Sequence, residues 1–173
     1  MDAMEFEGRN YTRRNEKWVD SGGLVVCESL QKDLNREYAK TVDPKKLSLE
    51  ECLAEGDKFK NSSSIGLALK FYEEAVERAD AVTMAYILPR ITSCYRKNGQ
   101  PQKAIDMLAY ANKTFGKHMV TPTLLTSVAA AYCDLEDYAR AKKCCDRAFA
   151  AMKGKTSDEL SLVYGRIKKA TMR

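Results

Sequence analysis

Small and apolar residues recur along this chain at a fixed period and with helical spacing. Five columns of aligned positions step by 36 residues and then by 37, and polar residues fill most of the positions between them. The columns are Gly56, Thr92 and Ala129; Phe59, Tyr95 and Tyr132; Ala68, Ala104 and Ala141; Tyr72, Leu108 and Cys145; and Ala75, Ala111 and Ala148. Offsets of three and four residues within each half of a unit are typical of helices. A repeat of this length predicts stacked helical hairpins.

Polar segments interrupt the pattern where each hairpin is expected to turn. The predicted turns are Ser62–Ser64, Asn98–Pro101 and Leu135–Asp137. Ser48 with Glu51 has the signature of a capping box before the first repeat, and Thr156 with Glu159 offers another before a final helix. Pro89 falls inside a predicted helix, so we expect a kink or a late helix start there.

The chain before the repeats divides into two predicted segments. Residues 1–23 are predicted to be extended or flexible, although Trp18 gives them one large apolar side chain. We expect Trp18 to dock on the repeats, closing their N-terminal end in preference to lying in their groove. Residues 24–47 are predicted to form a helix from Leu24 to about Thr41 and a linker, because apolar residues recur there every three or four positions. Residues 48–173 are predicted to form the repeat domain with a C-terminal capping helix.

The repeated segments AEGDKF…ALKFYEEA, ITSCY…AIDMLAYA and VAAAY…AKKCCDRA resemble the tetratricopeptide repeat (TPR) family. The resemblance covers residues 48–154 and, more loosely, 155–173. The tryptophan that is frequent near the start of the family's first helix is replaced here by Cys52, Leu88 and Leu125. The proline that often closes the family's second helix is replaced by Asp80, Gly116 and Lys153. The resemblance implies an all-α fold, a TPR-like α-solenoid of three helical hairpins with an added N-terminal helix and a C-terminal capping helix. It also implies a non-enzymatic scaffold or adaptor that binds a peptide or helix on its concave surface.

The first helix of each hairpin is expected to line that concave surface. The residues predicted to face a protein partner are Asp57, Lys60, Asn61, Tyr86, Arg90, Ser93, Lys97, Thr123, Ser127, Ala130 and Asp134. These residues are mostly polar and mixed in charge, and solvated surface is the alternative interpretation for each of them. Tyr86 and Arg90 stand one helical turn apart and belong to the residue types most common among interface anchors.

Some TPR proteins capture the C-terminal carboxylates of chaperones through lysine, asparagine and arginine side chains in this groove. The corresponding positions here hold Leu53, Asp57, Arg90, Thr123 and Ser127. Because most of these residues cannot provide the expected cationic and amide contacts, the carboxylate-binding function is disfavoured. A small chaperone that holds an extended protein segment remains an alternative, supported only by the layout of the repeats.

Charge is uneven along the chain. The net formal charge is +5, and residues 116–173 alone carry eleven Lys or Arg against six Asp or Glu, a difference of +5. A C-terminal basic face is therefore an alternative site for RNA, DNA or an acidic protein. Its members are Arg140, Lys142, Lys143, Arg147, Lys153, Lys155, Arg166, Lys168 and Lys169. Aromatic residues do not alternate with these charges, so a solvated face is the favoured interpretation.

Motifs for catalysis, cofactor binding and metal binding are not found in the sequence. It lacks a glycine-rich phosphate loop, a GxSxG elbow and CxxC spacing, and His118 is the one histidine. We therefore expect no catalytic residue, no cofactor and no metal. Cysteines expected to be buried and reduced are Cys52, Cys94, Cys133 and Cys145. No apolar run is long enough to span a membrane, and no secretory signal begins the chain, so we expect a cytoplasmic protein without a membrane partner.

Overall fold

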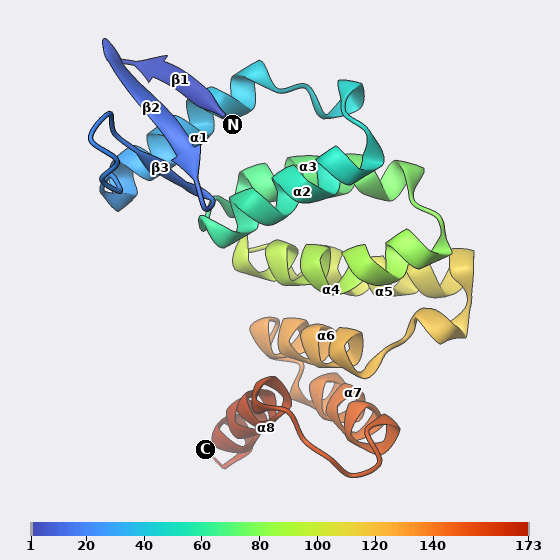
Figure 1. The fold of residues 1–173 in the computed structure, drawn as a ribbon. Coiled ribbons are helices and arrows are strands. Elements are labelled where there is room, and N and C mark those ends of the chain that lie inside the picture. Colours follow the sequence, from blue (N-terminus) through green and yellow to red (C-terminus); the bar gives the residue numbers. More distant parts are fainter. Residues whose placement is uncertain (1, 173) are drawn as a thin grey trace. The chain divides into compact units, whose positions relative to one another are not determined.

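The computed structural model describes residues 2–172 and divides the chain into two compact units (Figure 1). The first unit ends at Arg78 and the second begins at Ala79. This division falls inside the segment 48–173 that the sequence predicts as one repeat domain. The described residues beyond position 23 form helices and connections, and the strands lie between residues 3 and 19. The fold is therefore mostly all-α, with one small sheet added.

The first unit opens with a three-stranded antiparallel sheet in the order β1-β2-β3. Its strands are β1 (Ala3–Phe6), β2 (Arg9–Arg14) and β3 (Lys17–Val19). Glu7 and Gly8 connect the first pair, and Asn15 and Glu16 the second, all four with positive φ. Positive φ at both central residues is characteristic of the two-residue turns whose twist matches a hairpin. The segment expected to be extended or flexible thus forms two tight hairpins.

The helical hairpin of the first unit follows a short 3-10 turn. The elements are η1 (Pro44–Lys46), α2 (Leu49–Asn61) and α3 (Ile65–Arg78). The predicted capping box is confirmed, because the Ser48 hydroxyl accepts from the Glu51 N–H and the Glu51 carboxylate accepts from the Ser48 N–H. The helices end and restart on either side of the predicted turn at residues 62–64.

Helix α1 (Glu28–Thr41) begins four residues later than predicted. The expected start at Leu24 is wrong because the chain is still extended there, and Val25 forms an antiparallel bridge with Val19 of β3. The apolar pattern continues into this extended stretch, so periodicity alone could not place the helix start.

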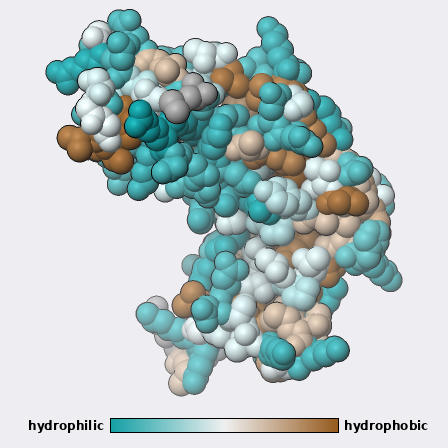
Figure 2. All heavy atoms as spheres, viewed as in Figure 1, coloured by the Kyte–Doolittle hydropathy of each residue, from teal (hydrophilic) through white to brown (hydrophobic). Residues whose placement is uncertain are grey.

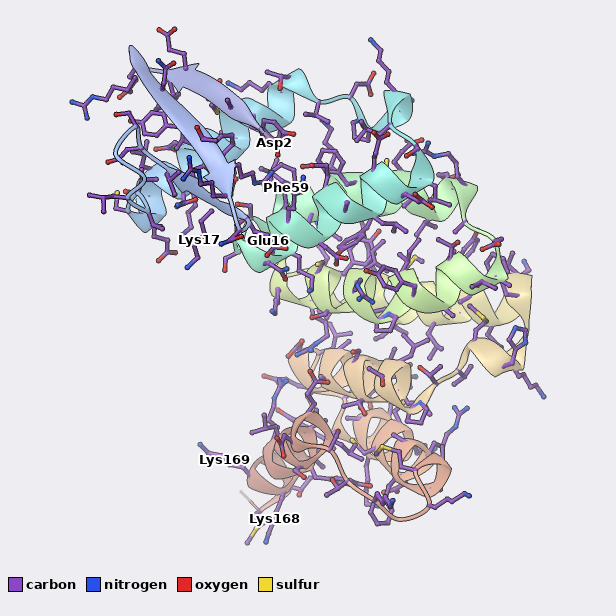
Figure 3. The ribbon with its side chains drawn as sticks, in the orientation of Figure 1. Asp2, Glu16, Lys17, Phe59, Lys168 and Lys169 are labelled. Carbon is purple, nitrogen blue, oxygen red and sulfur yellow. The ribbon has the colours of Figure 1, made fainter. Side chains whose placement is uncertain are left out.

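Trp18 on β3 is fully buried and holds the sheet against α1. Its ring centroid lies 5.6 Å from that of Tyr38, in an edge-on arrangement. Gln31 covers the outer edge of β3, since its Nε2 donates to the Trp18 carbonyl at 2.7 Å and its Oε1 accepts from the Trp18 N–H at 2.9 Å. Arg13 on β2 places its guanidinium 4.9 Å from the ring centroid of Phe59 on α2 (Figure 3). The sheet and α1 therefore pack on the first hairpin. The contacts described for Trp18 itself are with α1 and the sheet, whereas the sequence predicted that it would dock on the repeats.

The second unit continues the series of helices. They are α4 (Ala81–Lys97), α5 (Pro101–Phe115), the 3-10 turn η2 (Lys117–Met119), α6 (Pro122–Asp134), α7 (Tyr138–Ala151) and α8 (Asp158–Thr171). The predicted turns between α4 and α5 and between α6 and α7 are confirmed. Pro89 lies in the interior of α4 and does not delay its start. The cap predicted at Thr156 is wrong by one residue, because α8 begins at Asp158 and Ser157 accepts from the Leu160 N–H.

Most members of the repeated columns are buried and form the packed core of the hairpins, while Leu108 and Tyr132 are half-buried. The alanines of the columns on the second helices, all fully buried, are Ala68, Ala75, Ala104, Ala111, Ala141 and Ala148. Small side chains at helix crossings allow close approach of the backbones. Gly56 shows this most clearly, because a Cβ added there would lie 2.7 Å from Cε1 of the Tyr72 ring. The aromatic ring of Tyr72 on α3 therefore packs directly against Gly56 on α2.

Candidate protein-interaction surface

Three residues predicted to face a partner lie on α2, where they contact the rest of the first unit. Asp57 accepts a hydrogen bond of 2.5 Å from the Tyr72 hydroxyl. Lys60 donates to the Asn61 side chain at 3.3 Å. Asn61 donates at 2.9 Å to Glu16, in the turn between β2 and β3 (Figure 3). Asp57 therefore connects α2 to α3, and Asn61 connects α2 to the sheet.

Beside these residues lies an ionic cluster that the sequence analysis did not identify. The Arg13 side chain is 2% exposed, and its Nη1 lies 3.3 Å from Glu55 and 3.9 Å from Asp2. Lys58 pairs with both acids, at 2.5 Å from Glu55 and 3.5 Å from Asp2. Burial, with a contribution from Glu55, raises the pKa of Tyr38 above its ordinary range. The available signal was weak: Arg13 lies two residues after Tyr11, on the same face of β2, where a buried charge requires a partner.

Four further predicted residues lie on α4 in the second unit. Tyr86 is 41% exposed, and the Arg90 guanidinium carbon lies 3.5 Å from the centroid of its ring. Nη1 of Arg90 also donates to the Tyr86 carbonyl at 2.9 Å. Ser93 is half-buried and Lys97 is exposed. The helix thus presents a stacked aromatic and cationic pair, followed by smaller polar groups.

The remaining predicted residues lie on α6, which packs against α4 within the second unit. Thr123 is exposed and Ser127 is half-buried. Ala130 is only 4% exposed, so its predicted place on the partner-facing surface is wrong. Its small side chain belongs to the packed face of α6, together with most of that helix.

Asp134 at the end of α6 connects three helices of the second unit. Its Oδ2 accepts from Nε of Arg96 on α4 at 2.8 Å, and its Oδ1 accepts from Nη2 of Arg166 on α8 at 2.7 Å. Charge-assisted hydrogen bonds of this kind are shorter and stronger than neutral ones. Asp134 therefore holds α4 and α8 to α6, a structural role that the sequence analysis did not foresee. The sequence offers only a weak signal for this role of Asp134, because opposite charges near the ends of successive first helices are common on solvated faces.

The C-terminal basic residues are partly neutralised by neighbouring acids. Lys142 pairs with Asp146 at 2.7 Å, and Arg140 with Asp137 at 3.4 Å. Arg166, as described, is bound to Asp134. Three members of the predicted basic face therefore carry local partners, which lowers its attraction for a polyanion.

The cysteines divide into one exposed thiol and five buried ones. Cys52, Cys94, Cys133 and Cys145 are buried, as expected, and so is Cys144. Burial raises the pKa of Cys145 to about 12. Cys27 is exposed, and a hydrogen bond with Ser29 lowers the pKa of its thiol.

The part of the chain that the structure describes shows neither a metal-binding cluster nor a membrane-spanning helix. Residues 2–172 contain no group of three or more His, Cys, Asp or Glu side chains arranged to hold a metal ion. Among the same residues, no helix combines the length and apolar character needed to cross a bilayer. The face seen in Figure 2 is mostly hydrophilic, with hydrophobic side chains in separate spots. A partner on that face would meet mainly polar groups.

The comparison with solved structures gives a TPR domain. The crystal structure of the Sgt2 TPR domain from Aspergillus fumigatus superimposes with a TM-score of 0.61 and 19% identity, covering 72% of this chain and 79% of that one. Neither a protein-family model nor a curated protein matches the sequence. The likeness shows the fold: the helical hairpins have the TPR architecture that the repeated columns predict.

Proposed function

We propose that this chain is a non-enzymatic scaffold or adaptor that binds a peptide or helix of a protein partner. The proposed contact surface is the exposed face of α4 and α6 in the second unit. Its centre is the pair Tyr86 and Arg90, and its outer members are Ser93, Lys97, Thr123 and Ser127. First helices line the concave surface in solenoids of this class.

The stacking of Tyr86 and Arg90 is the observation that supports this proposal most. The guanidinium carbon of Arg90 lies 3.5 Å from the centroid of the Tyr86 ring, and Nη1 of Arg90 donates a hydrogen bond of 2.9 Å to the Tyr86 carbonyl. Both side chains are therefore held in place. Tyrosine and arginine are enriched among the residues that dominate binding energy. Anchors that are ordered before binding lose less conformational entropy when the partner arrives.

We also propose a cytoplasmic location, where this type of adaptor meets its partners. The described residues contain six cysteines and no disulfide. Reduced thiols of this number are usual in a reducing compartment.

Site-specific photo-crosslinking tests the proposed surface. A benzoyl-phenylalanine placed at Thr123 on α6 is expected to capture a protein partner. The matched control carries the same group at Lys143, an exposed position on α7. Capture from Lys143 and not from Thr123 would move the interface to the second helices and contradict the proposal.

The alternative that the ligand is a nucleic acid can be tested with the same protein and one further variant. If nucleic acid is the ligand, affinity must fall steeply with salt, because each neutralised phosphate releases counterions. The triple variant Lys142→Glu, Lys143→Glu, Arg147→Glu would then lose binding. A partner retained by that variant at moderate salt supports a protein ligand on α4 and α6.

A further inference from the structure

Helix α8 carries the small-residue column of the repeats into a fourth unit, although Lys168 stands where the aromatic column would continue. Gly165 lies 36 residues after Ala129, in the column that holds Gly56 on α2. On its inner face α8 buries Leu160, Val163 and Ile167, and it packs against α6 and α7 (Figure 1). It therefore occupies the position of a first helix.

The two glycines of this column differ in what they face. Gly56 is required by its neighbour, because a Cβ there would meet the ring of Tyr72 at 2.7 Å. A Cβ added at Gly165 would meet no heavy atom within 4 Å among the described residues. Glycine in a helix interior is destabilising relative to alanine. Packing among the described residues therefore gives no reason for the glycine of α8, whereas an aromatic ring packed over it would.

Gly165 lies in a shallow, open hollow on the outer face of α8, and the residues lining it all belong to that helix. The residues lining it are Asp158, Ser161, Leu162, Gly165, Arg166 and Lys169. Leu162 is 70% exposed, although it lies one helical turn from the glycine. The hollow thus has an apolar side chain and an uncrowded backbone at its centre, with polar and charged groups around them.

Charge narrows the choice of ligand. The hollow is lined by two cations, Arg166 and Lys169, and by one acid, Asp158, and Arg166 is already bound to Asp134 on α6. Lys169 is the cation that remains to meet a partner, and a carboxylate on a bound helix would complement it. Helix α3 shows a suitable pattern, because Tyr72 is followed by the acidic residues Glu73, Glu74 and Glu77.

We propose that the outer face of α8 binds an acidic amphipathic helix of a partner protein. A tyrosine or phenylalanine of that helix packs over Gly165, as the Tyr72 ring packs over Gly56. A carboxylate of that helix faces Lys169, and its apolar side chains cover Leu162. This interface is separate from the surface proposed for α4 and α6, so it holds or fails independently of the function proposed there.

A fluorescent peptide with the sequence of residues 64–78 is the probe. It carries Tyr72 with three glutamates against one lysine and one arginine, a net charge of −1. We expect the full chain to bind this peptide, and the peptide with Tyr72→Ala to bind about tenfold more weakly or less, as for loss of an interface anchor. Absence of binding to the full chain would overturn the proposal.

Variants of α8 test whether the peptide binds at this face. Gly165→Ala is expected to raise the melting temperature of the chain, because alanine favours the helix, and to weaken peptide binding. Lys169→Glu is expected to weaken binding, while Lys168→Glu, one residue away and pointing elsewhere (Figure 3), serves as the charge-matched control. Unchanged binding by Gly165→Ala, or a lower melting temperature, would contradict the proposal. A parent dimer that Gly165→Ala converts to a monomer in sedimentation would show that a second copy, and not a partner protein, occupies the face.

Discussion

The indole Nε1 of Trp18 donates a 2.8 Å hydrogen bond to Oδ1 of Asn35, and both side chains are fully buried. The amide nitrogen of Asn35 donates in turn to the hydroxyls of Ser62 and Ser64, at 2.9 Å and 2.8 Å. One asparagine therefore connects the N-terminal sheet, α1 and the turn between α2 and α3.

Replacing Asn35 with leucine is expected to destabilise the chain by about 1–3 kcal/mol, because the buried indole N–H loses its acceptor. Urea unfolding followed by the fluorescence of Trp18, the only tryptophan, measures this directly. The exposed Asn10 provides the control substitution Asn10→Leu. An unchanged urea midpoint for Asn35→Leu would show that the connection contributes nothing.

The helix crossings can be tested on α5. Ala104 is fully buried in a repeated column, so Ala104→Leu is expected to overfill the crossing and cost about 1–3 kcal/mol. Ala109→Leu on the exposed side of the same helix is the matched control. Thermal denaturation should show a loss of several degrees for the first variant alone. Equal melting curves would mean that the register of the columns is misassigned.

The register of the repeats could be predicted because the residues of each column share one structural role. Alanines such as Ala68 and Ala141 are dictated by helix crossings, and the hairpin turns follow from polar residues between apolar runs. The small sheet was not predictable in the same way, since its strands are short and its turns place Glu7 and Glu16 at positive φ, which glutamate rarely adopts.

The candidate surface could be predicted only in outline. Periodicity identifies the helix that a residue belongs to, and Tyr86 and Thr123 were placed on first helices in this way. It does not reveal contacts between distant charged side chains. The hydrogen bonds from Arg96 and Arg166 to Asp134 join three separate helices, so no local sequence pattern predicts them.

Asp134→Asn tests the connection of α4, α6 and α8. The substitution keeps the size of the side chain and removes the charge that two arginines share. The Asp134 side chain is 27% exposed, so we expect a modest loss of about 1 kcal/mol that becomes smaller at high salt. Glu136→Gln, in the adjacent exposed turn, is the control. A loss that is equal for both variants would rule out a specific role for the bridge.

Thiol reactivity should separate the cysteines. The Ser29 hydrogen bond lowers the pKa of Cys27, so a larger fraction of this thiol is ionised at a given pH than in an ordinary cysteine. Burial raises the pKa of Cys133, Cys144 and Cys145. Alkylation near pH 7.5 is expected to modify Cys27 first, as mass spectrometry would show. Removal of the fast phase by Cys27→Ser confirms the assignment, and fast modification of Cys145 would contradict the packing of α7.

The central claim is that the exposed face of α4 and α6 binds a protein partner. The double variant Tyr86→Ala, Arg90→Ala removes the stacked pair, and Val82→Ala, at an 80% exposed position of the same helix, is its control. The decisive measurement is the dissociation constant of the crosslinked and identified partner for parent, control and double variant, each checked for an unchanged melting temperature. The account predicts a loss of about 2 kcal/mol or more, roughly thirtyfold in affinity, for the double variant alone. Equal affinity for all three proteins would contradict it.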